Sequence, residues 1–259
     1  MVDARRRQIE QQKAQAPLAA LRAAAEARKE RREFDAALAK PGLSVIAELK
    51  RASPSRGMIR SDYRPDEIAR GYQSAGAAAI SVLTEKEFFG GTLSDLGIAR
   101  EATNLPVLRK DFVVDEYQIY ESAAAGADAL LLIAAALDAK KLERFLRISR
   151  DHRLTVLVEV HTEAELSQAV GCGAEVVGIN NRNLATLEVN VETSFALRGK
   201  IPPGCLAVSE SGIQTAEDFS RLEKAGFDAV LIGERLMSAE DPGRELARLL
   251  QTMRSLGPV

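Results

Sequence analysis

The sequence of 259 residues contains no tryptophan and has few cysteines and histidines. Its two cysteines, Cys172 and Cys205, are too few for a disulfide framework, so we expect both to be small core residues. Its two histidines, His152 and His161, do not have the spacing of metal ligands, and we expect no metal site. Motifs of several large enzyme classes are also missing, among them the P-loop, the G-x-S-x-G elbow and the H-E-x-x-H helix.

The chain also lacks a strong charge of either sign. Lys and Arg number 35 against 37 Asp and Glu, which gives a formal net charge of −2 and argues against a general nucleic-acid binder. The arginine run at residues 5–7 fits a solvated helix end better than a binding patch. No apolar run reaches the roughly 18 residues of a membrane span, and no secretory signal is visible. We therefore expect a cytoplasmic protein without nucleic-acid or membrane partners.

The first 43 residues differ from the rest of the chain. Residues 4–39 are rich in Ala, Arg, Glu, Lys and Gln, which are strong helix formers, and a Pro-Gly pair ends the pattern. Leu18, Leu21 and Ala25 recur at helical spacing. We expect one or two helices here, packed on the main domain or capping it.

From Ser44 onward, short apolar runs alternate with longer amphipathic stretches. The predicted strands are 44–50, 78–84, 106–112, 128–134, 155–160, 175–181, 205–211 and 228–234. Helical patterns cover 65–75, 115–125, 138–152, 162–170, 215–224 and 241–256. Repeated βα units predict a (β/α)8 TIM barrel over 44–259, preceded by an N-terminal helical extension over 1–43, within one domain overall. A doubly wound open sheet is the alternative, but it usually carries a glycine-rich fingerprint after its first strand, which is absent here.

Charged residues stand where the predicted strands end, and barrel active sites form at that side. They are Glu48, Lys50, Lys110, Glu159 and Glu210. Each could be a solvated residue of the rim or part of a structural ion pair. Together they favour a site, because converging carboxylates and ammonium groups perturb each other's pKa values and suit acid–base chemistry.

A second group of residues is typical of a phosphate site. In barrels, phosphate often binds backbone N–H groups of the loops after the seventh and eighth strands. Ser211, Gly212, Gly233 and Glu234 lie there, and Ser53 adds a hydroxyl from the loop after the first strand. Tight turns alone would also explain the glycines. The Glu234 carboxylate would repel a phosphate unless only its backbone N–H faces the site.

Seven strand-end motifs occur in order along the chain. They are AELKRASPS (47–55), SVLTE (81–85), LRKDF (108–112), LVEV (157–160), GINNRNL (178–184), SESGI (209–213) and LIGE (231–234). This set closely resembles the indole-3-glycerol phosphate synthase family, and the helical N-terminal extension is also typical of that family. The resemblance spans the chain and implies a carboxy-lyase of tryptophan biosynthesis that needs no cofactor. Its substrate would be 1-(2-carboxyphenylamino)-1-deoxyribulose 5-phosphate, which loses CO₂ and water.

The resemblance also implies roles for individual residues. Lys110 matches the general acid, and Glu159 matches a carboxylate that acts as a base or stabilises the cationic intermediate. Glu48 and Lys50 match the pair that serves binding and dehydration. The remaining matches position substrate (Asn180, Glu210, Ser211), bind phosphate (Ser53, Ser211, Gly212, Gly233, Glu234), face the substrate carboxylate (Arg182) or form the apolar wall (Pro54, Phe89, Phe112, Leu131, Leu184, Ile232).

Three other functions stay open from the residues alone. Lys50 or Lys110 would suit a Schiff-base aldolase, because a neighbouring cation can depress the pKa of a lysine. A sugar-phosphate isomerase would use an acid–base pair placed for enolisation. A non-catalytic barrel would use only the phosphate site. We expect a monomer, with a weak homodimer as the alternative.

Overall fold

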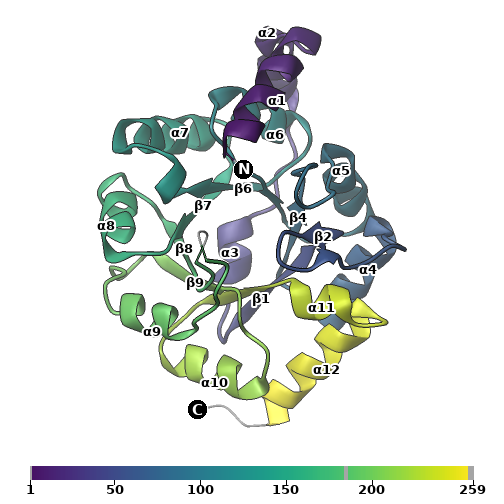
Figure 1. The fold of residues 1–259 in the computed structure, drawn as a ribbon, viewed down its shortest axis with the longest axis vertical. Coiled ribbons are helices and arrows are strands. Elements are labelled where there is room, and N and C mark those ends of the chain that lie inside the picture. Colours follow the sequence, from purple (N-terminus) through teal and green to yellow (C-terminus); the bar gives the residue numbers. More distant parts are fainter. Residues whose placement is uncertain (1, 184–185, 256–259) are drawn as a thin grey trace.

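Eight parallel strands form a closed barrel in the computed structural model, which describes residues 2–183 and 186–255 (Figure 1). They are β1 (Ser44–Leu49), β4 (Ala79–Leu83), β5 (Val107–Lys110), β6 (Ala129–Ile133), β7 (Thr155–Val160), β8 (Val176–Asn180), β9 (Leu206–Glu210) and β10 (Ala229–Ile232). They follow one another around the barrel in chain order, and β10 closes it by pairing with β1. The predicted TIM barrel is confirmed, and every strand lies inside a predicted run.

Helices surround the strands. They are α4 (Pro65–Ala75), α5 (Leu93–Ala102), α6 (Glu116–Ala124), α7 (Ala139–Asp151), α8 (Glu163–Gly171), α9 (Glu192–Arg198), α10 (Ala216–Lys224), α11 (Glu234–Ser238) and α12 (Pro242–Ser255), with a 3-10 turn η1 (Ala134–Ala136). Thr162 and Thr215 cap α8 and α10 as their sequence signals predict. The sequence reading missed α5, α9 and α11. Two of these are short, and α5 contains a glycine that weakens its helical pattern.

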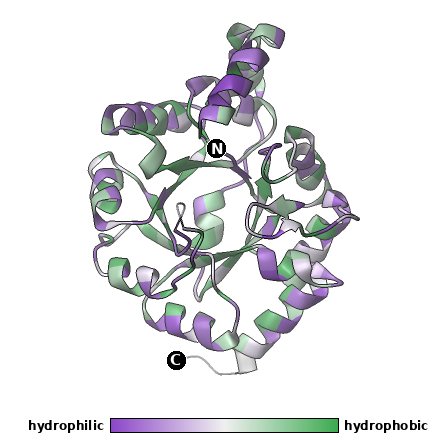
Figure 2. Ribbon diagram, in the orientation of Figure 1, coloured by the Kyte–Doolittle hydropathy of each residue, from purple (hydrophilic) through white to green (hydrophobic). Residues whose placement is uncertain are grey.

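The strands separate two apolar layers. Side chains that point inward fill the barrel, as Ile46, Leu108 and Leu157 do, and their neighbours point outward to the helices. This alternation follows from the two-residue period of a strand. Figure 2 shows the result, with largely hydrophobic strands inside helices whose faces are mixed. Because every second strand residue enters the barrel, the last inward residue of a strand stands at its mouth.

The N-terminal segment forms three helices, where the sequence predicts one or two. They are α1 (Val2–Gln15), α2 (Leu18–Ala27) and α3 (Phe34–Leu38). Leu18 and Leu21 pack against the core beside buried Ala25, as expected, and α1 and α2 lie against α6 (Figure 1). The short α3 closes the other end of the barrel, where Phe34 and Leu38 are fully buried against the inner layer.

Two expectations about single residues are wrong. Arg5 is not solvated: it is 5 % exposed, and its guanidinium donates to Asp111 at 2.7 Å. The strand-end carboxylate draws α1 onto the barrel mouth, which the local arginine run does not reveal. Cys172 and Cys205 are half-buried free thiols at the edge of the core rather than core residues. No helix within residues 2–183 and 186–255 is long and apolar enough to span a membrane.

The loop after β1 contains a small hairpin that the sequence does not predict. Its strands are β2 (Ala52–Ser53) and β3 (Gly57–Met58), which pair antiparallel. The backbone N–H of Ala52 donates to the Phe89 carbonyl in the loop after β4. The hairpin is therefore joined to a neighbouring loop, and it holds Ser53 over the mouth of the barrel.

Candidate active site

A cavity of about 620 Å³ opens at the carboxyl ends of the strands. Every site residue predicted from the sequence and described in the structure lines it. These are Glu48, Lys50, Ser53, Pro54, Phe89, Lys110, Phe112, Leu131, Glu159, Asn180, Arg182, Glu210, Ser211, Gly212, Ile232, Gly233 and Glu234. Leu184 lies outside the described residues. The spacing of the strand-end motifs thus brings distant parts of the chain into one cavity.

Strand register explains why the charged residues face one another. On β5, Leu108 belongs to the inner apolar layer, so Lys110, two residues later, also points inward. On β7, Leu157 and Glu159 have the same relation. The charged side chains therefore form the top layer of the barrel interior, directly above an apolar floor.

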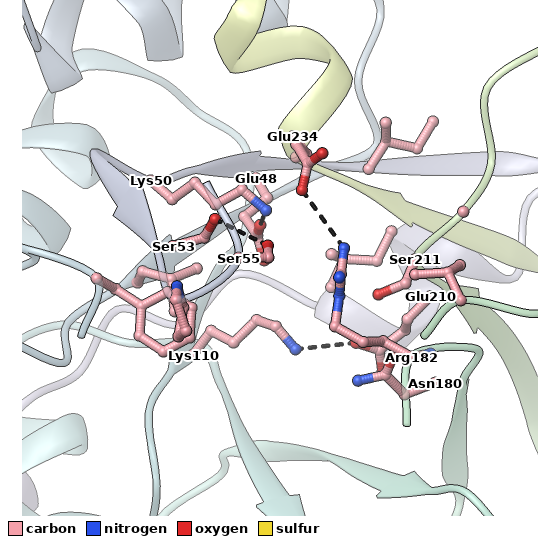
Figure 3. Close-up of a pocket in the computed structure, with 18 of the residues that line it drawn as sticks. Glu48, Lys50, Ser53, Ser55, Lys110, Asn180, Arg182, Glu210, Ser211 and Glu234 are labelled. Atoms are coloured by element: carbon pink, nitrogen blue, oxygen red, sulfur yellow. Dashed lines mark hydrogen bonds and ion pairs between the residues drawn. The ribbon is translucent and has the colours of Figure 1, made fainter. Parts of the chain in front are cut away.

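Lys110 lies between two buried carboxylates. Its Nζ is 3.1 Å from Glu159 Oε2 and 2.9 Å from Glu210 Oε2. A second ion pair stands beside it, with Lys50 Nζ 2.8 Å from Glu48 Oε1 (Figure 3). Three carboxyl groups and two ammonium groups thus share one cavity.

Their proximity shifts the pKa values in different directions. Burial would lower the pKa of Lys110, but the negative charges of Glu210, Glu159 and Glu48 outweigh it and raise that pKa above its ordinary value. Burial also raises the pKa of Glu210, to about 7, because the charge of Glu159 adds to it and Lys110 compensates only in part. For Glu159, burial is outweighed by Lys110, by His161 and by hydrogen bonds from Asn180 and Lys110, so its pKa falls. At neutral pH the site therefore holds an ammonium group, an ionised carboxylate and a carboxyl that readily exchanges its proton.

Two glycines make room for these carboxylates. A Cβ atom on Gly233 would collide with the side chain of Glu48, and one on Gly178 would collide with that of Glu210. Any larger residue would push a carboxylate out of place. Gly178 belongs to a quoted motif but was not among the predicted site residues, because only the neighbouring strand shows what it faces.

The rim of the cavity carries a chain of ion pairs. Glu234 forms an ion pair with Arg182 at 3.4 Å (Figure 3). A second guanidinium, that of Arg56, lies 2.8 Å from Glu234, and Arg182 also donates to the Leu187 carbonyl. The repulsion expected between Glu234 and a phosphate is thus reduced, because two guanidinium groups neutralise its charge. After β9, Ser211 and Gly212 both have positive φ values, 68° and 79°. A positive φ is unusual for serine and strains the backbone, and strained residues of this kind cluster at functional sites.

Aromatic side chains form one wall. The rings of Phe89 and Phe112 lie with their centroids 6.5 Å apart. The loop that carries Phe89 is tied down by Glu85, whose carboxylate accepts backbone N–H bonds from residues 87, 88 and 89. Ile232 lines the cavity but also packs in the outer apolar layer, and Leu131 belongs to the inner layer.

Comparison with known proteins agrees with this architecture. The family model described as indole-3-glycerol phosphate synthase matches residues 1–249. The chain belongs to this family. The synthase of Chromobacterium violaceum is 50 % identical over 237 residues, which cover 90 % of this chain and 89 % of that protein. The synthase of Albidiferax ferrireducens is 47 % identical over 256 residues, 97 % of each chain. A thiamine phosphate pyrophosphorylase from Pyrococcus furiosus shares the fold, with a TM-score of 0.63 at 18 % identity, over 83 % of this chain and 98 % of its own.

The structure also reveals cavity residues that reasoning about strand ends did not select. Glu85 and Asp111 line the cavity and were quoted in motifs, yet they had no assigned role. Arg56 lines it too, and no local pattern marked it. Asp111 could have been selected from the sequence, because it is an acidic residue at the end of a predicted apolar strand. For Arg56 there was none, because its partner Glu234 is far away in sequence. Among the described residues, no group of three or more His, Cys, Asp or Glu side chains is arranged to hold a metal.

Proposed function

We propose that this cavity converts 1-(2-carboxyphenylamino)-1-deoxyribulose 5-phosphate into indole-3-glycerol phosphate, with loss of CO₂ and water. Membership of the family supports the reaction. The position of Lys110 between Glu159 and Glu210 is the observation that supports assigning the chemistry to these three residues. The reaction requires a proton donor at a ketone oxygen inside a cavity that excludes water. A buried ammonium group that stays protonated can stabilise the negative charge that develops on this oxygen and transfer a proton to it as the bond forms.

In the first step, an electron-rich carbon of the aromatic ring attacks the ketone carbon. We assign Lys110 to protonate the ketone oxygen as the new bond forms. The ring then carries positive charge, which is released when the carboxyl group leaves as CO₂. Glu159, ionised and 3.1 Å from Lys110, would stabilise that cation. Attractive electrostatics in a dry cavity are worth far more than in water.

In the last step, the new hydroxyl leaves as water while a ring proton is removed. A carboxylate and an ammonium group close together can supply both transfers, and Glu48 and Lys50 are such a pair at 2.8 Å. Asn180 and Glu210 would position the substrate. Asn180 and Glu210 are register partners on β8 and β9, and Lys110 reaches Glu210 from the opposite wall of the barrel.

The substrate's two anionic ends would be bound at the rim. Arg182 suits the carboxylate, because a guanidinium can bind both oxygens. For the phosphate we propose the Ser53 hydroxyl together with backbone N–H groups at Ser211, Gly212, Gly233 and Glu234. The aromatic ring of the substrate would lie against an apolar wall formed by Pro54, Phe89, Phe112, Leu131 and Ile232.

The raised pKa of Lys110 argues against a Schiff-base aldolase, because that chemistry needs a neutral amine. Borohydride trapping of a carbonyl substrate on Lys50 or Lys110 would instead support the aldolase. We further propose that residues 1–43 belong to the same folding unit as the barrel, that the protein acts in the cytoplasm as a monomer, and that its partner is this small phosphorylated substrate. Sedimentation would distinguish the monomer from a weak homodimer.

The deciding test follows indole fluorescence in purified, EDTA-treated protein given the proposed substrate. Since the chain contains no tryptophan, the product would appear against a low background. A rising signal without added metal or cofactor is expected. A flat signal with tight substrate binding would indicate a non-catalytic barrel. A flat signal without binding would favour an aldolase or an isomerase.

A further inference from the structure

A histidine lies directly behind the cavity, against Glu159. His161 directly follows β7 and is not one of the described residues that line the cavity. Its side chain is 13 % exposed. Its Nε2 is 3.4 Å from Glu159 Oε1, and its Nδ1 is 3.2 Å from Glu165 Oε2 on α8. The imidazole thus stands between a carboxylate of the cavity and a carboxylate behind it.

The two oxygens of Glu159 face different partners. Oε2 accepts a hydrogen bond from Lys110, and Oε1 faces His161. Asn180 also donates a hydrogen bond to this carboxylate, and once Nε2–H donates to Oε1, the carboxylate cannot rotate about its last bond without losing a partner. The imidazole is therefore placed to keep one particular oxygen of Glu159 directed at Lys110 and the cavity.

The far side of the ring is already fixed. Glu165 Oε2 accepts the backbone N–H of His161 at 2.8 Å and lies against Nδ1 of the same residue. Within the described part of the chain, His161 Nε2 is buried and makes no hydrogen bond of ordinary geometry. A buried nitrogen in that state needs an explanation. Hydrogen bonds of acid–base sites are often long before substrate binds and shorten afterwards, which fits a contact of 3.4 Å.

We propose that His161 is a positioning residue for Glu159: with a proton on each ring nitrogen, its Nε2–H donates to Glu159 Oε1 during turnover, while its Nδ1–H donates to Glu165 Oε2, which orients the ring from behind. This rests on the proposed function of Glu159. The charged groups on this line are Glu165 on α8 and Glu159 on β7, with Lys110 and Glu210 beyond Glu159. Glu159, His161 and Glu165 thus form a series in which each side chain orients the one before it, an arrangement that is common in active sites.

Two substitutions separate this role from a merely structural one. The amide nitrogen of His161→Gln extends about as far as Nε2, so it can still donate to Glu159. The shorter amide of His161→Asn can replace only Nδ1. We expect His161→Gln to keep kcat within about threefold, and His161→Asn to lose ~10- to 100-fold with KM nearly unchanged, as misplacement of a reacting group does. Both variants should unfold at similar temperatures, because both retain a polar side chain.

The pH profile gives a second readout. Since His161 helps to lower the pKa of Glu159, its loss should raise that pKa. The acid limb of kcat against pH should then move upward in both variants, because neither amide is charged, and it should move less in His161→Gln, whose N–H can still donate to Glu159. His152→Asn is the matched control. His152 is the other of the two histidines, and its ring packs edge-on against Tyr120 on α6. It should leave kcat and the pH profile unchanged.

A measurement without turnover tests the contact itself. In protein labelled with ¹⁵N-histidine, Glu159→Gln should shift the Nε2 resonance of His161 and leave that of His152 in place. Equal kcat and pH profiles in His161→Asn, His161→Gln and wild type would overturn the proposal, and so would an unmoved Nε2 resonance. If the wild type does not convert the substrate at all, the proposed function fails, and the Nε2 resonance alone then decides whether His161 holds Glu159.

Discussion

Two buried ion clusters lie back to back on β5. Lys110 points into the barrel and Arg109, its neighbour, points outward to α6, and each cation contacts two carboxylates. In both clusters the distances from the cation on β5 to its carboxylates lie between 2.7 and 3.1 Å. The clusters differ in how completely their polar atoms are satisfied, and that difference separates a structural cluster from a reactive one.

The Arg109 cluster is saturated. The Arg109 guanidinium is 1 % exposed and donates to Asp111 at 2.9 Å, to Glu121 at 2.7 Å and to the hydroxyls of Thr84 and Ser122. Asp111 accepts further bonds from Thr84, at 2.7 Å, and from its own neighbour's backbone. Such a network fixes the geometry of the strand end, because every N–H of the Arg109 guanidinium already has a partner.

The Lys110 cluster has a polar atom that makes no hydrogen bond within the described residues. Within the described residues, Glu210 Oε1 is buried and has no hydrogen-bond partner. The ammonium group faces a cavity on its open side rather than another helix. Unsatisfied groups of this kind cost stability and are retained where they serve chemistry. The cluster at the cavity is therefore distinguished by a carboxyl oxygen that is free to bind a substrate, and not by its charge alone.

The largest expected effect comes from Lys110→Met. It removes the proton donor that we propose for ring closure, so turnover should fall ~10³-fold while the protein stays folded. Indole fluorescence measures turnover, and circular dichroism measures folding. Turnover close to that of wild type would remove Lys110 from the mechanism and weaken the contrast between the clusters.

Arg109→Met is the matched control and should give the opposite result. It leaves Glu121 buried without a cation and Asp111 with Arg5 alone, and breaking a buried pair in this way costs about 3–5 kcal/mol. Urea unfolding measures the loss. The fraction that stays folded should retain turnover within about tenfold of wild type, since Arg109 does not reach the cavity. An unchanged free energy of unfolding would contradict the structural role of this cluster.

Glu210→Gln tests the unsatisfied carboxyl through pH. Its pKa of about 7 in the folded protein, against an ordinary 4.5, means that folding favours the protonated form. The stability from this group is present below about pH 4.5 and is lost as pH rises through 7, by up to ~3 kcal/mol. Glutamine cannot ionise. The variant should therefore gain stability relative to wild type between pH 5 and pH 8 in urea titrations, and parallel curves would refute the shift.

The smallest expected effect concerns the contact between the Arg109 cluster and helix α1, which Arg5 makes with Asp111. Arg5→Ala removes the buried donor 2.7 Å from Asp111 and should cost about 1–3 kcal/mol. Arg6→Ala is its control, because Arg6 pairs with Asp3 at the surface, and exposed pairs contribute about 0–1 kcal/mol. Limited proteolysis should release α1 earlier in the Arg5 variant only. Equal behaviour of the two variants would mean that apolar contacts alone hold α1.

Much of the fold was predictable because it depends on local patterns. The runs of β-branched residues identify all eight barrel strands, and threonine caps identify α8 and α10. The hairpin of β2 and β3 was not predictable, because strands of two residues have no period to detect and its first N–H bonds a separate loop. The third N-terminal helix, α3, is equally short and is stabilised by burial against the barrel interior.

The sequence by itself determined which side chains enter the barrel. A strand has a period of two, so placing Leu108 in the core also places Lys110 at the mouth, whatever the rest of the chain does. Only the tertiary structure decided which partner each charge meets. Lys110 contacts Glu159 and Glu210, which are 49 and 100 residues away, and Arg5 reaches Asp111 across 106 residues. The two lysine pairs arise when the barrel closes and brings the ends of distant strands within hydrogen-bonding distance, and the Arg5 pair arises when α1 packs onto the barrel.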